Sequence, residues 1–69
     1  MEMEYTNTQI REIIGEHIHN ERDRRIMARR LIDGITMERL AEEFDISVSQ
    51  VKRIVWKCSG EIFRHLKVN

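Results

Sequence analysis

The sequence predicts an all-α fold: a small domain of four helices, or of five if the last helix breaks at a glycine. None of the 69 residues is proline, so no residue forces a helix to end. Apolar residues recur at spacings of three and four, which places them on one face of a helix. Serine, threonine or asparagine precedes each such run, where a side-chain oxygen can cap the first turn. We expect one domain over residues 1–69, with the marginal stability of a chain that buries about 60% of its unfolded surface.

The first helix is predicted over about residues 8–18. Any of Thr6, Asn7 and Thr8 can cap it, because each side chain can accept a hydrogen bond from a free backbone N–H. The apolar stripe of this helix consists of Ile10, Ile13, Ile14 and Ile18. This stripe is expected to face the core.

The second helix is predicted over about residues 21–33, between a cap at Asn20 and a left-handed stop at Gly34. Its apolar stripe consists of Ile26, Met27, Leu31 and Ile32. The arginines between them have two interpretations. They can pair with nearby carboxylates (Glu12, Glu16, Glu21 and Asp23), or Arg29 and Arg30 can reach an external phosphate.

The third and fourth helices are predicted over about residues 37–44 and 48–66, capped by Thr36 and Ser47. Leu40, Ala41 and Phe44 are expected to point inward from the third. The apolar stripe of the fourth consists of Val48, Val51, Ile54, Val55, Ile62, Phe63 and Leu66. Gly60 costs about 1 kcal/mol inside a helix, so a bend or a break is expected there.

The pair of helices over about residues 37–55 fits a helix-turn-helix. Two short helices joined by a tight turn need a small residue where they cross, an apolar residue in the turn and an apolar stripe on the second helix. Ala41, Ile46, Val51 and Ile54 fill these positions in order. The turn position that usually holds glycine is Asp45, and aspartate is among the few residues that tolerate the left-handed backbone.

Charge is unevenly distributed along the chain. The 12 lysines and arginines balance the 12 aspartates and glutamates, so net charge indicates no partner. Residues 1–46 hold 7 basic and 11 acidic side chains, whereas residues 47–69 hold 5 basic and 1 acidic. The C-terminal third is therefore the part to which a phosphate backbone would be attracted.

Residues 31–57 read LIDGITMERLAEEFDISVSQVKRIVWK. A leucine, a glycine, a threonine, an alanine-centred helix and an S-x-S-x-V-[KR]-x-I helix follow one another in this run, which resembles region 4 of bacterial sigma factors. The chain is too short for the promoter-melting region of a complete sigma factor. The resemblance therefore implies a freestanding region 4 module, a kind of small regulator found in bacteria, phages and mobile elements.

The outer face of the fourth helix is the predicted DNA-reading surface. Subtracting the buried stripe leaves Ser49, Gln50, Lys52, Arg53, Trp56 and Lys57. The predicted base-reading residues are Ser49, Gln50, Lys52 and Arg53. Arg53 can bond guanine with two hydrogen bonds, Gln50 can pair with adenine, and Lys52 can reach guanine or phosphate.

The predicted phosphate contacts are Thr36, Arg39, Ser47 and Lys57. Ser47 precedes the N-terminus of the fourth helix, where free backbone N–H groups favour an anion. Trp56 has two interpretations, as a packed residue or as a DNA contact. Packing is favoured, because burial of an indole contributes more than one phosphate hydrogen bond.

The sequence predicts no enzyme, no cofactor and no metal site. It offers no nucleophile with a base and an orienting group, and no glycine-rich phosphate loop. Cys58 and the histidines (His17, His19 and His65) lack metal-ligand spacing. A single cysteine, with no leader or membrane segment in the sequence, favours a reduced, cytoplasmic compartment.

These observations predict a sequence-specific transcriptional regulator that binds double-stranded DNA with its fourth helix in the major groove. The alternative is a protein-interaction module that binds RNA polymerase, as the resemblance implies, or that inhibits another nucleic-acid machine. A small helix-turn-helix binds DNA weakly alone, so a homodimer formed through the first helix is a third partner to consider. No membrane partner is expected.

Overall fold

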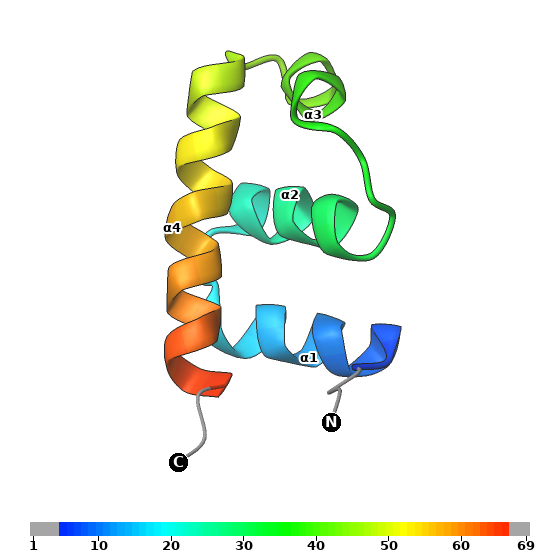
Figure 1. Cartoon of the computed structure of the whole chain (residues 1–69), viewed down its shortest axis with the longest axis vertical. Coiled ribbons are helices and arrows are strands. Elements are labelled where there is room, and N and C mark those ends of the chain that lie inside the picture. The colour runs from blue at the N-terminus through cyan, green and yellow to red at the C-terminus, as the bar shows by residue number, and fades with distance from the viewer. Residues whose placement is uncertain (1–4, 67–69) are drawn as a thin grey trace.

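The structure, a computed structural model, describes residues 5–66, and the side chains of residues 5–64. The described chain forms four helices and no strand: α1 (Asn7–His17), α2 (Glu21–Leu31), α3 (Met37–Phe44) and α4 (Val48–Leu66). Figure 1 shows α1, α2 and α3 stacked along the length of α4. The predicted all-α fold is confirmed.

Side-chain caps start all four helices. Thr6 caps α1 in a reciprocal box with Gln9, so α1 begins one residue earlier than predicted and ends at His17. The Asn20 side chain accepts from the backbone N–H of Asp23 at 3.0 Å and starts α2. Thr36 does the same for α3 and Ser47 for α4, both at 3.1 Å. These caps satisfy backbone N–H groups that the helices leave without partners.

The end of α2 differs from the prediction. This helix stops at Leu31, two residues early, because Gly34 takes a left-handed φ of 69° and the backbone N–H of Ile35 donates to the carbonyl of Arg29 at 3.2 Å. That hydrogen bond turns the chain across the last turn of α2. Leu31 is 45% exposed and lies outside the core, because it lines a surface groove that no described residue covers.

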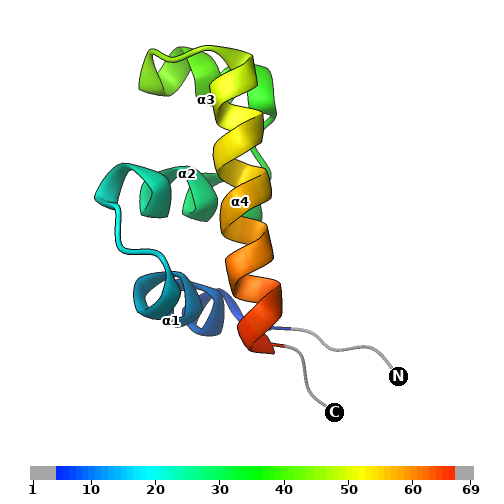
Figure 2. The ribbon, with the colours of Figure 1, turned by 90° about the vertical axis from the view of Figure 1, so that its left-hand side faces the viewer.

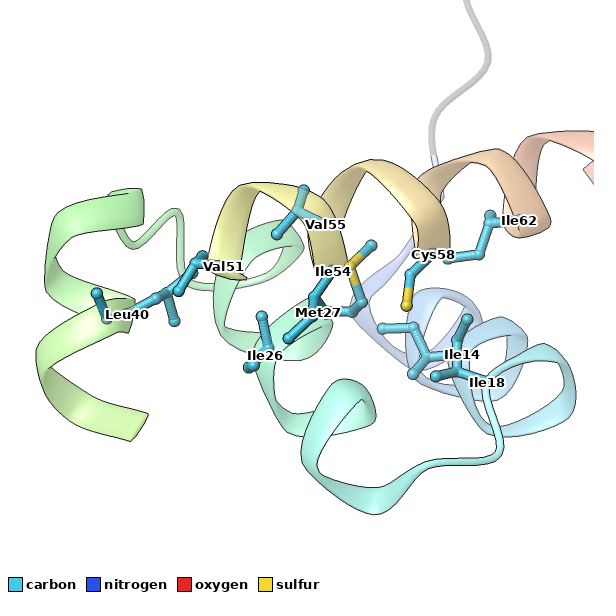
Figure 3. Close-up of a cluster of buried hydrophobic side chains, with 11 residues drawn as sticks. Ile14, Ile18, Ile26, Met27, Leu40, Val51, Ile54, Val55, Cys58 and Ile62 are labelled. Atoms are coloured by element: carbon cyan, nitrogen blue, oxygen red, sulfur yellow. The ribbon is translucent and has the colours of Figure 1, made fainter. Parts of the chain in front are cut away.

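The core lies where α4 meets the three shorter helices (Figure 3). It consists of Ile14, Ile18, Ile26, Met27, Leu40, Ala41, Val51, Ile54, Val55, Cys58 and Ile62. Both α2 and α4 contact every other helix, whereas α1 and α3 do not contact each other within the described residues. Figure 2 shows α3 beside the N-terminal end of α4 and α1 beside its C-terminal end. The helix α4 therefore joins the two ends of the domain.

The predicted break at Gly60 is wrong, because α4 runs as one helix of 19 residues. Cys58 and Ile62, on either side of the glycine, are 2% and 6% exposed. Burial of these side chains offsets the cost of about 1 kcal/mol that glycine imposes on a helix. Gly60 itself is exposed, with no atom within 4 Å of where a Cβ would lie.

Phe63 is a second correction on α4. It was expected in the core but is 69% exposed, because it lies about 100° around the helix from the buried Ile62. The side chain of Leu66, also expected in the core, lies outside the described residues. The last turns of α4 therefore bury a narrower stripe than the sequence predicts.

Candidate nucleic-acid interface

The turn between α3 and α4 has the geometry of a helix-turn-helix. Asp45 ends α3 in the left-handed conformation, with φ 57° and ψ 47°. Ile46 then donates its backbone N–H to the carbonyl of Ala41 at 3.0 Å, and Ser47 caps α4. Ala41 is 7% exposed within the core that the two helices share. The left-handed aspartate that the sequence predicts at this turn is confirmed.

The first half of α4 presents one solvent face and one core face. Val51, Ile54 and Val55 are buried. The six residues predicted to face outward are all exposed: Ser49, Gln50, Lys52, Arg53, Trp56 and Lys57. No carboxylate occurs between Ile46 and Gly60, so the charge of this solvent face is wholly positive. Such a face attracts the phosphates of a nucleic acid.

Within residues 5–64, the cations of this face make no ion pair: none of Lys52, Arg53 and Lys57 takes part in a side-chain hydrogen bond or an ion pair. Arg39 on α3 is likewise exposed and makes no side-chain hydrogen bond or ion pair over the same residues, and its charge helps to lower the pKa of Glu43. These four charges are available to an external anion without breaking an internal contact.

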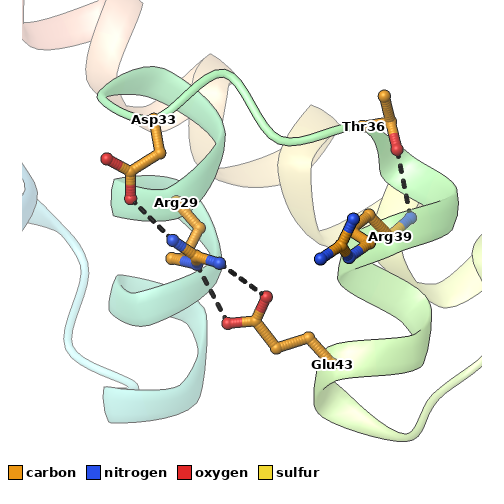
Figure 4. A network of polar contacts seen from close by, with 5 residues as sticks. All are labelled: Arg29, Asp33, Thr36, Arg39 and Glu43. Carbon is orange, nitrogen blue, oxygen red and sulfur yellow. Dashed lines mark hydrogen bonds and ion pairs between the residues drawn. The ribbon is translucent and has the colours of Figure 1, made fainter.

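The arginines at the end of α2 behave in the opposite way (Figure 4). Arg29 donates from Nε and Nη2 to the two carboxylate oxygens of Glu43, both at 2.9 Å, and from Nη1 to Asp33 at 2.9 Å. Arg30 donates to the backbone carbonyl of Ile35 at 2.9 Å. Both are used inside the protein, which disfavours the interpretation of Arg29 and Arg30 as phosphate contacts.

The bidentate contact between Arg29 and Glu43 joins α2 to α3 and lowers the pKa of the Glu43 carboxyl. The hydrogen bonds from Arg29 hold the pKa of Glu43 below its ordinary value of 4.5. Thr36 and Arg39 lie beside this network, and the Thr36 hydroxyl oxygen accepts from the backbone N–H of Arg39. The Thr36 hydroxyl proton stays free to donate.

Gln50 takes part in the cap of α4. Its Oε1 accepts from the backbone N–H of Ser47 at 3.1 Å, while the Ser47 hydroxyl oxygen accepts from the backbone N–H of Gln50. The spacing S-x-x-Q is the sequence signature of this reciprocal cap, which the sequence analysis missed. Pairing with adenine needs the same amide oxygen as an acceptor. The cap holds this oxygen against the backbone of Ser47, so an adenine pair must use its second lone pair or displace the cap.

Trp56 is 81% exposed, so the favoured interpretation of Trp56 as a packed residue is wrong. The buried stripe of α4 passes through Val55 and leaves residue 56 on the solvent side. The indole lines a shallow hollow together with Met37 of α3 and the side chains of Lys52 and Arg53. A large exposed aromatic ring beside two cations is suited to contact with a partner.

Comparison with known protein families identifies the family to which this helix-turn-helix belongs. A family model described as sigma-70, region 4 matches residues 20–58, which is more than half of the chain. The chain belongs to the sigma-70 region 4 family. Comparison with curated proteins and with solved structures finds no significant match.

Region 4 is a DNA-binding helix-turn-helix module and not an enzyme family, and its members bind DNA and RNA polymerase. The matched residues cover α2, α3 and the part of α4 that carries the exposed cations. The helix α1 and the end of α4 lie outside the match. The predicted resemblance is confirmed for the helix-turn-helix and the helix that precedes it.

The described part of this region 4 chain lacks the side-chain groups of a metal site and the apolar length of a membrane span. No group of three His, Cys, Asp or Glu residues between positions 5 and 64 could hold a metal ion. No helix in the same part is long and apolar enough to cross a membrane. Cys58 is buried, and burial raises the pKa of its thiol, which disfavours the reactive thiolate.

Proposed function

We propose that the protein is a cytoplasmic, sequence-specific transcriptional regulator that places the first half of α4 in the major groove of double-stranded DNA. The observation that carries the proposal is the exposed face of α4. Its three cations are unpaired within the described chain, whereas Arg29 of α2 is held by carboxylates. Family membership supports DNA binding.

Base reading is assigned to Arg53 and Lys52, with Ser49 and Gln50 beside them. A guanidinium can bond guanine O6 and N7 together, and lysine can reach the same atoms. Because its Oε1 already accepts a hydrogen bond in the cap, the two N–H donors are the groups that the Gln50 amide presents most freely. This favours contact with an acceptor, such as guanine O6 or thymine O4, over the adenine pair that the sequence suggests.

Phosphate contacts are assigned to Thr36, Arg39, Ser47 and Lys57. Thr36 and Ser47 precede the first turns of α3 and α4, where the N-terminal end of a helix favours an anion. Arg39 and Lys57 supply free charge on either side of the reading residues. The exposed Trp56 adds an apolar contact, for which a thymine methyl group is the natural partner.

A selection of bound sequences from a random duplex pool tests this function. We expect the selection to yield one short motif. Lys52→Ala should weaken binding to it, whereas Arg11→Ala, which removes the same charge from the exposed surface of α1, should not. Equal loss in both variants, or no enrichment at all, would contradict the assignment.

The second candidate is binding to RNA polymerase, a partner of region 4 family members. The exposed Trp56 favours it, because aromatic rings are enriched among the anchors of protein interfaces. Capture of purified RNA polymerase in the presence of nuclease, lost in Trp56→Ala and kept in Lys52→Ala, would support this candidate. Absence of capture by the wild-type protein when nuclease is present would contradict this candidate.

One chain offers one reading helix, so we also infer that two copies act together on the DNA. Small helix-turn-helix proteins reach useful affinity by binding two half-sites about one turn of DNA apart. The selected sequences should then contain a repeated or palindromic motif.

A further inference from the structure

An apolar groove lies between α1 and the second half of α4. Figure 2 shows that these two segments lie at the end of the molecule away from α3. Its volume is about 220 Å³, and its walls include Ile10 and Ile13 of α1 and Ile62 of α4. Apart from Leu31, every residue that lines it lies outside the region 4 match. The groove is therefore a feature of this chain rather than of the matched region.

Two large apolar side chains stand exposed at this groove. Phe63 is 69% exposed and Leu31 is 45% exposed, and both line the groove. Exposure of a phenyl ring to water is unfavourable, and burial of such a side chain is worth about 1.5–3 kcal/mol. The surface thus presents a projecting ring directly beside a hollow.

The sizes of the ring and the hollow match. A buried cavity of about 150 Å³ is large enough to hold benzene, so a groove of about 220 Å³ has room for one phenyl ring. An interface between two identical chains related by a two-fold axis uses the same patch twice, and the patch must then be complementary to itself. A ring and a hollow on one surface meet that requirement.

The lack of charge in the described lining also favours a second copy of the chain as the occupant of the groove. No charged residue is among the described residues that line the groove, so this lining adds no repulsion between like charges when two copies approach. A basic or acidic partner peptide would find no side chain of opposite charge in the lining. We propose that this groove binds a second copy of the chain, with Phe63 of each copy seated in the groove of the other.

The arrangement leaves the DNA-reading residues uncovered, because Ser49 to Arg53 lie near the other end of α4. A dimer would then carry two reading helices, a consequence that rests on the proposed function. The dimer itself does not depend on DNA and can be tested without it.

Sedimentation equilibrium of the full chain over a range of concentrations tests the proposal. Without DNA, the wild-type protein should have the mass of two chains. Phe63→Glu should raise the dissociation constant of the dimer at least about 100-fold, because the burial of two phenyl rings is lost. Arg64→Gln changes the net charge by the same amount at an equally exposed neighbour and should behave as wild type.

Because Phe63 is exposed, Phe63→Glu should keep the helical circular dichroism of the wild type. A wild-type protein that stays a single chain at millimolar concentration would overturn the proposal, as would a Phe63→Glu protein that dimerises normally. Loss of the dimer in Arg64→Gln as well would overturn it too, because the effect would then be one of charge.

Oxidation of a Phe63→Cys variant gives a second measurement. The two thiols would lie close to the two-fold axis and should form a disulfide-linked dimer, whereas an Arg64→Cys variant should link less. The native Cys58 is buried and takes no part. Equal cross-linking of both variants would place the interface elsewhere. Failure of the wild type to bind DNA would contradict only the proposed function.

Discussion

We expect sequence recognition to depend most on Arg53, because it combines an exposed position on α4 with a guanidinium that has no hydrogen-bond or ion-pair partner in the described chain. We expect Arg53→Ala to weaken binding to the selected motif by about 1–3 kcal/mol and to relax preference at one base position. Binding to random duplex should change less. Equal losses on both duplexes, measured by fluorescence anisotropy, would make Arg53 a phosphate contact instead.

Gly60 tests whether α4 is a single rigid helix. It is exposed, with no atom near the position of a Cβ, so Gly60→Ala should stabilise the protein by about 0.5–1 kcal/mol in urea unfolding. Gly34→Ala is the matched control and should destabilise, because Gly34 has a φ of 69° that alanine adopts poorly. Destabilisation by Gly60→Ala would mean that the helix does bend there.

At the scale of elements, the caps and the turn could be predicted from the sequence because they depend on neighbours three or four residues apart. Asn20, Thr36, Ser47 and Asp45 all have the local roles that their residue types predict. The exposure of Trp56 and Phe63 and the continuity of α4 depend on how the helices pack, which local spacing does not encode. The free cations of α4 were predictable as exposed residues, but their lack of partners was not.

The contact between α2 and α3 could not be predicted from local spacing either, because Arg29 and Glu43 are 14 residues apart. This ion pair should make the free energy of unfolding depend on pH. The hydrogen bonds from Arg29 lower the pKa of Glu43 in the folded state. Their contribution to the free energy of unfolding is therefore fully present above the ordinary pKa of a glutamate. It is lost as the pH falls through the lowered pKa of the folded state.

A pH series of melting temperatures measures this contribution. Glu43→Gln should melt below the wild type at pH 7, and the difference should shrink as the pH falls below about 4. Glu42→Gln removes the same charge from an exposed neighbour that has no ion pair in the described chain, and should have little effect. A difference between Glu43→Gln and wild type that is the same at pH 3 and pH 7 would contradict the role of the ion pair.

The crossing of α3 and α4 is the other contact between elements that the function requires. Ala41 is 7% exposed there, so Ala41→Leu should destabilise the protein by about 1–3 kcal/mol through overpacking, which is a large share of the stability of a small domain. Thermal unfolding followed by circular dichroism measures the change. An unchanged melting temperature would show that the two helices have room at residue 41 and that the helix-turn-helix is loosely packed.

At the scale of the whole molecule, the exposed face of α4 and the end of α2 differ in whether their cations have partners within the described residues. Over residues 5–64, Lys52, Arg53 and Lys57 of α4 and Arg39 of α3 make no ion pair. Arg29 at the end of α2 instead holds α2 to α3, and Arg30 bonds to the carbonyl of Ile35. The net charge of zero hides this division, which explains why composition alone indicates no nucleic-acid partner. The apolar groove lies at the other end of α4, so the proposed DNA-reading residues and the proposed dimer interface occupy separate parts of one helix.

The salt dependence of DNA affinity tests the central claim most directly, because it counts phosphate contacts without knowledge of the target. Each neutralised phosphate adds about 0.9 to the slope of log affinity against log salt. Contacts from Arg39, Lys52, Arg53 and Lys57 should give a slope of about 3–5 in magnitude for one chain, and about twice that for two. Lys57→Ala should lower the slope by about 1 per chain and leave the sequence preference intact. A slope near zero would contradict the claim that the exposed face of α4 is a DNA-binding surface.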